Sequence, residues 1–203
     1  MIVKSFEINK INNSHKIFLF YGENEGHKNE IMEDKFKKKY TNSIYVYEEN
    51  EILKNQENFF NEILSKSFFE KEKLIIINRT TDKIKNLIDE IIEKKIDDII
   101  IILNSNSLEK KSKLRILFEK NKDLTCIAFY ADNNQTLNSI INFFFREKKI
   151  SISQQLINVL IERSRGDRKN LKNELQKIES FSLNKKNINF QEIIKLTNLA
   201  DNY

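Results

Sequence analysis

The residues best suited to chemistry lie in a short turn after the first apolar run of the chain. A working phosphate loop reads G-x-x-x-x-G-K-[ST], in which backbone N–H groups surround the phosphates, the lysine neutralises them and the hydroxyl binds Mg²⁺. Here three residues instead of four separate Gly22 from Gly26, and His27 occupies the position of the lysine. Asn29 replaces the hydroxyl residue that would follow Lys28. The turn therefore resembles a phosphate loop that has lost the residues it needs.

Negative charge in the same turn also opposes phosphate binding. Glu23 and Glu25 lie between the two glycines. At close range, each pair of like charges repels by about 1 kcal/mol or more. We therefore expect Gly22, Gly26 and Lys28 to form a degenerate phosphate loop that binds no nucleotide, and we expect no cofactor.

The fourth apolar run gives a second test of the same chemistry. A hydrolysing enzyme of this class needs acidic residues at the carboxyl end of a strand, where ligands gather, to hold Mg²⁺ and orient water. Ile99–Leu103 is followed instead by Asn104, Ser105 and Asn106, and the acidic pair Asp97-Asp98 precedes the run. The chain is expected to keep the frame of an ATPase without its catalytic site.

The elements that position this turn are predicted by five short apolar runs. Runs of this length, rich in Ile, Phe, Tyr and Val, are typical of buried strands in a parallel sheet, and helix-like segments follow the first four of them. This alternation predicts an α/β fold with helices on both faces of a five-stranded sheet. The predicted strands are Ile17–Tyr21, Ile44–Tyr47, Leu74–Ile77, Ile99–Leu103 and Leu124–Tyr130, and the predicted helices are Glu30–Lys39, Ile52–Leu64, Ile84–Ile92 and Ser107–Glu119.

The pattern changes near Asn133, after which only helices are predicted. Leu137–Phe145 and Asn170–Phe181 have helical spacing, Ser153 is a candidate cap for a helix between them, and Asn189 is a candidate cap for a last one. The chain is therefore expected to contain an α/β domain over residues 1–135 and a small helical domain over residues 136–203.

Composition and charge limit the functional classes that fit the sequence. The chain has 203 residues with a net charge of +5, which permits a nucleic-acid or acidic partner without requiring one. No apolar run is long enough to span a membrane and the start lacks the layout of a signal peptide, so no membrane association and a cytoplasmic location are expected. Cys126 is the one cysteine, and no Cys/His cluster suggests a metal site.

Three segments resemble a known family. FLFYGENEG at Phe18–Gly26 is similar to the start of bacterial DNA polymerase III delta subunits, in which a strand enters Tyr-Gly and an acidic loop. SKSFFEKEKLIIINR at Ser65–Arg79 resembles a family segment with a hydrophobic pair before a strand. RSRGDRKNLKNELQKIESF at Arg163–Phe181 is similar to a helix of the family's second domain. The order and spacing of these segments carry the resemblance, which extends over nearly the whole chain.

The resemblance implies a RecA/AAA+-like domain followed by a helical lid. Delta subunits bind and open the beta sliding clamp so that it can be loaded onto primed DNA, without hydrolysing ATP themselves. The implied partners are the clamp, the gamma/tau and delta prime subunits of the loader, and primed DNA. The chain is then expected to have no catalytic site of its own while belonging to the DNA polymerase III holoenzyme, a nucleotidyltransferase. Family members continue into a helical collar domain, whereas this sequence ends at Tyr203 without one, so we expect either that the sequence is a fragment or that the collar is lost.

The resemblance also implies a clamp-binding site. Phe68 and Phe69 match the hydrophobic pair that family members insert into the clamp, and Ser67 is expected to shape the turn before them. Adjacent side chains cannot share one face of a helix or strand, so one ring tends to point outward. The lysines and glutamates around the pair would form the polar rim of a binding hot spot. The alternative is that Phe68 closes the preceding helix and Phe69 begins the inward row of the next strand.

Other interpretations remain open from the sequence. Gly166, Asp167 and Arg168 lie where active relatives carry a sensing arginine, but Lys169 falls at the aligned position, and a helix break with an N-cap is the simpler interpretation. An active phosphate-loop ATPase of a related loader is one alternative function. A basic DNA-binding module is another, although no predicted helix has a basic face interleaved with base-reading residues.

Overall fold

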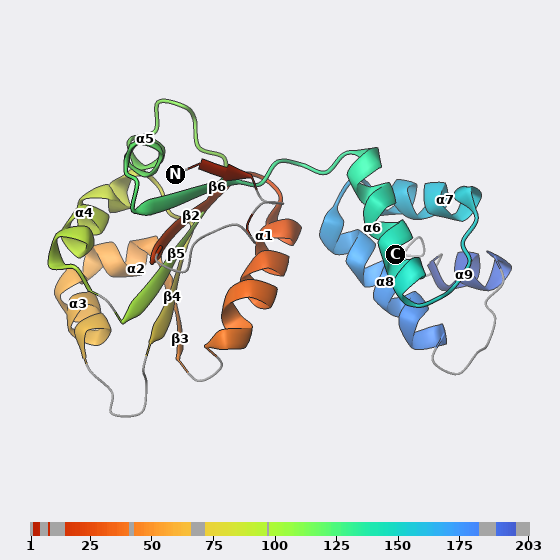
Figure 1. Cartoon of the computed structure of the whole chain (residues 1–203), viewed down its shortest axis with the longest axis horizontal. Helices are drawn as coiled ribbons and strands as arrows, with labels where there is room; N and C mark the ends of the chain where they lie inside the picture. The colour runs from red at the N-terminus through yellow and green to blue at the C-terminus, as the bar shows by residue number, and fades with distance from the viewer. Residues whose placement is uncertain are drawn as a thin grey trace. The chain divides into compact units, whose positions relative to one another are not determined.

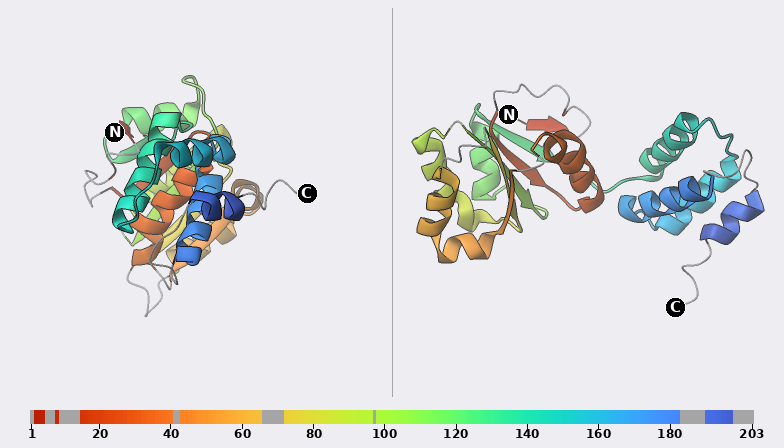
Figure 2. Two further views of the ribbon diagram at one scale, coloured as in Figure 1. Left: turned by 90° about the vertical axis from the view of Figure 1, so that its right-hand side faces the viewer. Right: turned by 90° about the horizontal axis from the view of Figure 1, so that it is seen from below.

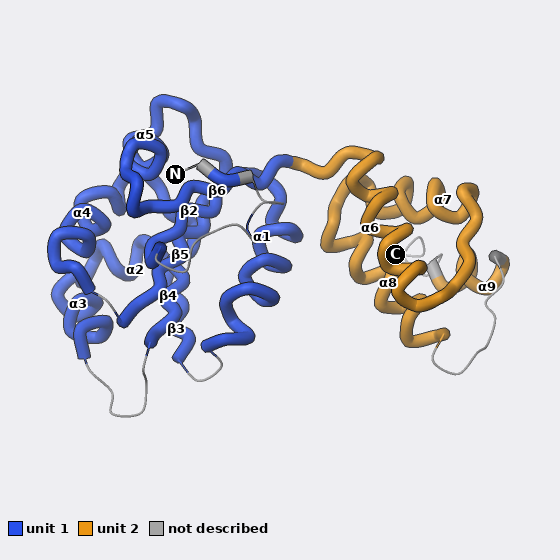
Figure 3. The backbone as a smooth tube through the Cα atoms, in the orientation of Figure 1, with its two compact units in different colours: residues 1–130 blue, residues 131–203 orange. Residues whose placement is uncertain are grey.

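A computed structural model of the chain describes residues 2–4, 8, 15–40, 43–65, 72–96, 98–182 and 190–197 (Figure 1). The chain forms two compact units, residues 1–130 and 131–203, which Figure 3 draws in different colours. Each unit has its own hydrophobic core and is described by itself.

The first unit is built on a parallel sheet, which confirms the predicted α/β class. All five predicted strands are present, and the sheet described here has one more strand than the five predicted. The extra strand, β1, pairs in parallel with β6. It was missed because three residues are too few to show a strand pattern. The strands are β1 (Ile2–Lys4), β2 (Ile17–Tyr21), β3 (Ile44–Glu48), β4 (Lys73–Asn78), β5 (Ile99–Ser105) and β6 (Leu124–Ala128), in the order β1-β6-β2-β5-β4-β3.

Helices cover both faces of this sheet (Figures 1 and 2). One face packs against α2 (Glu49–Lys54), α3 (Gln56–Leu64), α4 (Lys85–Lys94) and α5 (Lys113–Lys120) through a large apolar cluster. On the other face lies α1 (Glu25–Ile31), which continues through a π-helical turn at Met32–Phe36 and a 3₁₀ turn at Lys37–Lys39. The middles of the central strands are mostly apolar because they are buried on both faces of the sheet.

Polar capping side chains set the ends of several helices, and the spacing of apolar residues did not predict these ends. The predicted helix Ile52–Leu64 is divided at Asn55, which leaves helical geometry and whose side chain accepts a hydrogen bond from the Asn58 N–H at 3.1 Å. The helix predicted from Ser107 begins instead at Lys113, where Ser112 is the N-cap. Side-chain acceptors of this kind satisfy the first N–H groups of a helix.

The second unit contains α6 (Asn134–Glu147), α7 (Gln154–Ser164), α8 (Arg168–Ser182) and α9 (Phe190–Thr197). One stripe of each helix enters a shared apolar core that includes Leu137, Leu160 and Leu175. Ser153 caps α7, as predicted, by accepting from the Leu156 N–H. No helix among the described residues is both long and apolar enough to cross a membrane.

Candidate functional site

The degenerate phosphate loop lies at the carboxyl edge of the sheet, between β2 and α1. Strand pairing places Tyr21, the last residue of β2, beside Ser105 of β5 and Ala128 of β6. Gly22 follows with φ +124°, and a Cβ at this position would lie 2.2 Å from the Phe129 carbonyl oxygen. Glycine is therefore required here by both backbone conformation and space.

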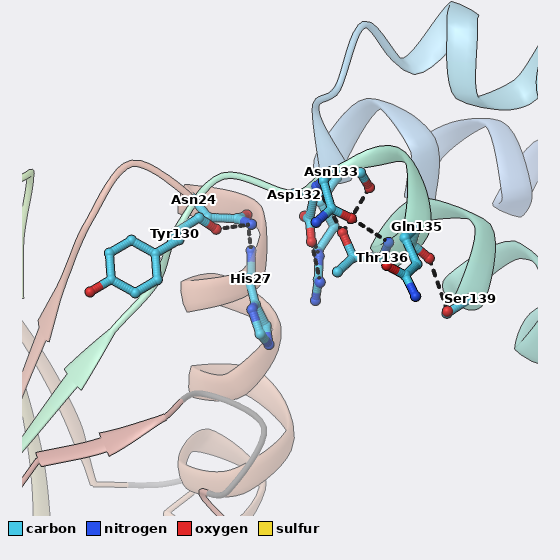
Figure 4. Close-up of polar contacts among 9 residues, drawn as sticks. Asn24, His27, Tyr130, Asp132, Asn133, Gln135, Thr136 and Ser139 are labelled. Carbon is cyan, nitrogen blue, oxygen red and sulfur yellow. Dashed lines mark hydrogen bonds and ion pairs between the residues drawn. The ribbon is translucent and has the colours of Figure 1, made fainter.

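Asn24 closes the turn with its own side chain. Its amide oxygen accepts from the His27 N–H, and its amide nitrogen donates to the Tyr130 carbonyl, each at 3.0 Å (Figure 4). Its backbone N–H donates to the Phe129 carbonyl at 3.3 Å. These contacts make Asn24 the N-cap of α1 and attach the loop to the chain that follows β6.

Most backbone N–H groups of the loop have acceptors within the protein. The Gly22 N–H donates to the Asn106 carbonyl at 3.3 Å, and the Lys28 N–H donates to the Asn24 carbonyl at 3.0 Å. Together with the His27 and Asn24 N–H groups described above, these donors have acceptors within the chain. A phosphate loop needs such groups free to surround its anion.

The side chain of Lys28 is also directed into the protein. Its side chain is fully buried, and its ammonium donates to the Ser105 carbonyl at 2.8 Å and pairs with the Glu25 carboxylate. The one lysine of the loop is therefore bound to the end of β5, and the negative charge beside it comes from the protein itself. Sequence inspection alone gave no sign of this burial.

The neighbouring strand ends carry amides and hydroxyls. Asn78 ends β4, and Asn104 and Ser105 end β5, with the Asn104 amide donating to the Asn78 side-chain oxygen at 3.2 Å. Asp98 precedes β5 at the opposite edge, while Asp97 lies outside the described residues. These strand ends thus offer no carboxylate to a metal ion.

Asp82 is the first acidic residue after β4 in the sequence, and its carboxylate is bound within the fold. Its carboxylate accepts from the Ser112 hydroxyl at 2.5 Å and from the Leu114 N–H at 3.0 Å. It therefore stabilises the start of α5. Among the described residues, no group of three or more His, Cys, Asp or Glu side chains is arranged to hold a metal ion.

The predicted clamp-binding residues Ser67, Phe68 and Phe69 lie outside the described residues. The structure describes the chain on both sides of them, up to Ser65 and from Glu72 onward.

Glu72 is held by two side chains that precede it in the sequence. Its carboxylate accepts from the Lys16 ammonium at 2.8 Å and from the Tyr40 hydroxyl at 3.1 Å. The hydrogen bond from Lys16 is the main reason that the pKa of Glu72 lies below its ordinary value. Burial, and then the Glu72 carboxylate, raise the pKa of Tyr40 to about 12.

In the helical unit, the segment before α8 forms the expected break and cap. Gly166 has φ +76°, and the Asp167 carboxylate accepts from the Asn170 N–H at 2.8 Å. Arg168 donates from two nitrogens to the Asp132 carboxylate at 2.7 and 2.6 Å, and both side chains are largely buried. The arginine considered as a sensing residue is thus bound inside its own unit, an ion pair that the sequence did not indicate.

Comparisons with known structures show what fold the chain shares. A Bacillus subtilis DNA clamp loader delta protein is similar over 95% of this chain, with 15% identity and a TM-score of 0.60. A Thermotoga maritima RuvB Holliday junction branch migration motor is similar over 88% of this chain and 60% of its own, with 14% identity and a TM-score of 0.54. The sheet, the loop position and these likenesses show a RecA/AAA+-like fold.

Residues 18–128 match the family model described as DNA polymerase III, delta subunit, which covers more than half of the chain. The chain therefore belongs to the DNA polymerase III delta subunit family. It spans 61% of the length of the Bacillus subtilis delta protein. No curated protein matched it in a sequence comparison.

Proposed function

We propose that this chain acts as a clamp loader delta subunit that binds and opens the beta sliding clamp, for loading onto primed DNA, without hydrolysing ATP itself. Family membership supports the delta assignment. The main observation in support of a chain without ATPase activity is the position of Lys28. Its buried ammonium contacts the Ser105 carbonyl and the Glu25 carboxylate. A lysine held in this way cannot neutralise a phosphate unless it breaks both contacts.

The remaining parts of the loop support the same proposal. Five backbone N–H groups of the turn, that of Glu25 included, have acceptors within the chain, and the adjoining ends of β4 and β5 carry no carboxylate. Nucleotide binding would have to replace these contacts and overcome the charge of Glu23 and Glu25. In this proposal, the chain contributes an ATPase-like fold to an assembly in which other subunits bind ATP.

The proposed clamp contact is made by Phe68 and Phe69, with Ser67 shaping the turn before them. The support comes from the family resemblance and from the apolar pair within a charged stretch. Burying one phenyl ring contributes about 1.5–3 kcal/mol. The proposed partners are the beta clamp, the gamma/tau and delta prime subunits and primed DNA, in the cytoplasm. In this proposal, the helical unit is the lid domain that the sequence predicted over residues 136–203.

The test is clamp binding by a double variant. Replacing Phe68 and Phe69 by alanine should weaken binding to the organism's own clamp by about 2 kcal/mol or more, because the apolar anchors of a hot spot dominate its energy. Affinity can be measured by surface plasmon resonance with immobilised clamp, and circular dichroism verifies that the variant is folded.

Phe143→Ala is a matched control, because Phe143 is a phenylalanine on α6 with a side chain that is more than half exposed. It should leave clamp affinity unchanged. Wild-type affinity in the Phe68/Phe69 double variant would count against the proposed site. Steep salt-dependent DNA binding without any clamp affinity would favour the alternative of a DNA-binding module.

A further inference from the structure

A basic groove lies along α5, on the face of the sheet that α5 shares with α4. Its volume is about 400 Å³, and it follows one side of α5 over the whole length of the helix. The residues that line it are Lys85, Lys113, Ile116, Leu117, Lys120 and Asn121. Three of these residues are lysines and none is acidic. The groove therefore has the charge of a site for an anionic partner.

Asp82 fixes the two helix starts that carry Lys85 and Lys113. Its carboxylate accepts from the Ser112 hydroxyl at 2.5 Å and from the Leu114 N–H at 3.0 Å. Lys85 is the first residue of α4 and Lys113 is the first residue of α5, and the two helices pack against each other (Figure 1). The N–H groups at a helix start carry partial positive charge, to which a lysine at the first position adds. This end of the groove is therefore strongly positive.

Two of the three lysines are available to a partner. Lys113 and Lys120 are exposed, and within the described part of the chain neither belongs to an ion pair. They lie on one face of α5, about 10 Å apart along its axis. Lys85, by contrast, already pairs with Asp89 at 2.5 Å. Carboxylates spaced along an extended or helical segment could pair with Lys113 and Lys120 together.

The floor of the groove between these lysines is apolar. Ile116 and Leu117 are both half-buried, and Leu117 packs partly onto the apolar cluster beneath it, to which Ile116 does not belong. An apolar floor with a charged rim is the usual arrangement for binding the side chains of a peptide. A nucleic-acid backbone would use the lysines but gain little from this floor, and the groove has no aromatic side chain on which bases could stack.

We propose that this groove binds an acidic peptide segment of a partner protein. The apolar side chains of the segment lie on Ile116 and Leu117, and its carboxylates pair with Lys113 and Lys120. Charge complementarity and the apolar floor together favour this partner over nucleic acid. The site uses none of the residues of the predicted clamp contact, so this proposal goes beyond the proposed function and does not depend on it.

Fluorescence anisotropy with the labelled peptide Asp-Asp-Glu-Leu-Leu-Glu-Asp tests the proposal on the full chain. We expect saturable binding that weakens as the NaCl concentration rises, because salt screens exposed charges. The same peptide with serine in place of both leucines should bind about tenfold more weakly, because it loses the apolar contact. Ile116→Ala should weaken binding of the leucine peptide several-fold. If the leucine peptide does not bind, or if the serine peptide binds equally well, the proposal is overturned.

A charge-matched control tests the location of the site. The double variant Lys113→Glu/Lys120→Glu should weaken binding by about tenfold or more, because each change replaces an attraction with a repulsion. Lys35→Glu/Lys39→Glu alters the net charge equally, at exposed positions of the turns after α1 on the other face of the sheet. It should stay within about twofold of the wild-type affinity, because distant charges are screened. Equal losses in the two double variants would overturn the proposed site.

Two further measurements cover the remaining outcomes. Circular dichroism verifies that each variant is folded, and Lys113→Gln/Lys120→Gln, which removes both charges without reversing them, should still weaken binding several-fold. Labelled single-stranded oligothymidylate is the second probe. If it bound more tightly than the leucine peptide, and if the lysine variants abolished that binding, the groove would be a nucleic-acid site and the proposed partner would be wrong.

Discussion

At the scale of single residues, the loop after β2 is shaped by internal contacts in place of a ligand. Gly22 approaches the Phe129 carbonyl, Asn24 caps α1, and Lys28 reaches the end of β5. The sequence indicated that the loop had lost its phosphate-binding residues. It could not indicate that Lys28 is buried, because a lysine next to a degenerate motif has the same local pattern whether its ammonium faces solvent or a carbonyl.

The glycine gives a prediction at this scale. Gly22→Ala should lower the free energy of unfolding by about 3 kcal/mol or more, since it combines an unfavourable φ with a backbone collision. The Phe129 carbonyl cannot easily move away, because it accepts from Asn24 and its residue donates to the Tyr21 carbonyl at 2.8 Å. Urea unfolding measures the change.

Gly166→Ala is the control for this prediction. Its φ is also positive, at +76°, but no atom beyond its neighbours in the chain lies within 4 Å of the added Cβ. The variant should therefore lose only about 1 kcal/mol, from backbone conformation alone. Equal losses in the two variants would contradict the close approach of Gly22 to Phe129.

At the scale of elements, the helical unit depends on a buried ion pair between the segment before α6 and the start of α8. Arg168 binds both carboxylate oxygens of Asp132, and this fork geometry is available to arginine but not to lysine. The pair fixes how the chain enters the unit relative to α8.

Arg168→Ala should accordingly destabilise the chain by about 3 kcal/mol, because it leaves the buried Asp132 carboxylate without its two guanidinium donors. Arg168→Lys should lose less, since it keeps the charge. Lys172→Ala, at an exposed position of the same helix, should change stability by no more than about 0.5 kcal/mol. Urea unfolding of the three variants measures these changes in the free energy of unfolding. If Arg168→Ala lost no more stability than Lys172→Ala, the role of the ion pair would be contradicted.

Sequence periodicity predicted the elements well where many apolar residues share a pattern. The five long strands and the helical stripe of α8 were identifiable because burial requires apolar residues at regular spacing. Short or polar features were not identifiable in this way. The three-residue strand β1, the division at Asn55 and the burial of Lys28 each depend on a partner that is distant in sequence or on one polar cap.

At the scale of the whole molecule, the chain has a fold similar to that of the RuvB branch migration motor and belongs to the DNA polymerase III delta subunit family. The clamp contact was predicted from residues 67–69, which lie outside the described part of the chain, so it remains a proposal. The described residues include a loop whose lysine is bound within the protein. They also give a physical reason why the proposed activity should not depend on nucleotide.

That independence gives the most direct test. The purified chain should be titrated with the organism's sliding clamp by isothermal calorimetry, in the absence of nucleotide and again with saturating MgATP. We expect the same Kd in both titrations and no binding heat when MgATP is added to the chain alone. Clamp binding that appears only with MgATP, or a tight MgATP complex of the chain itself, would contradict it.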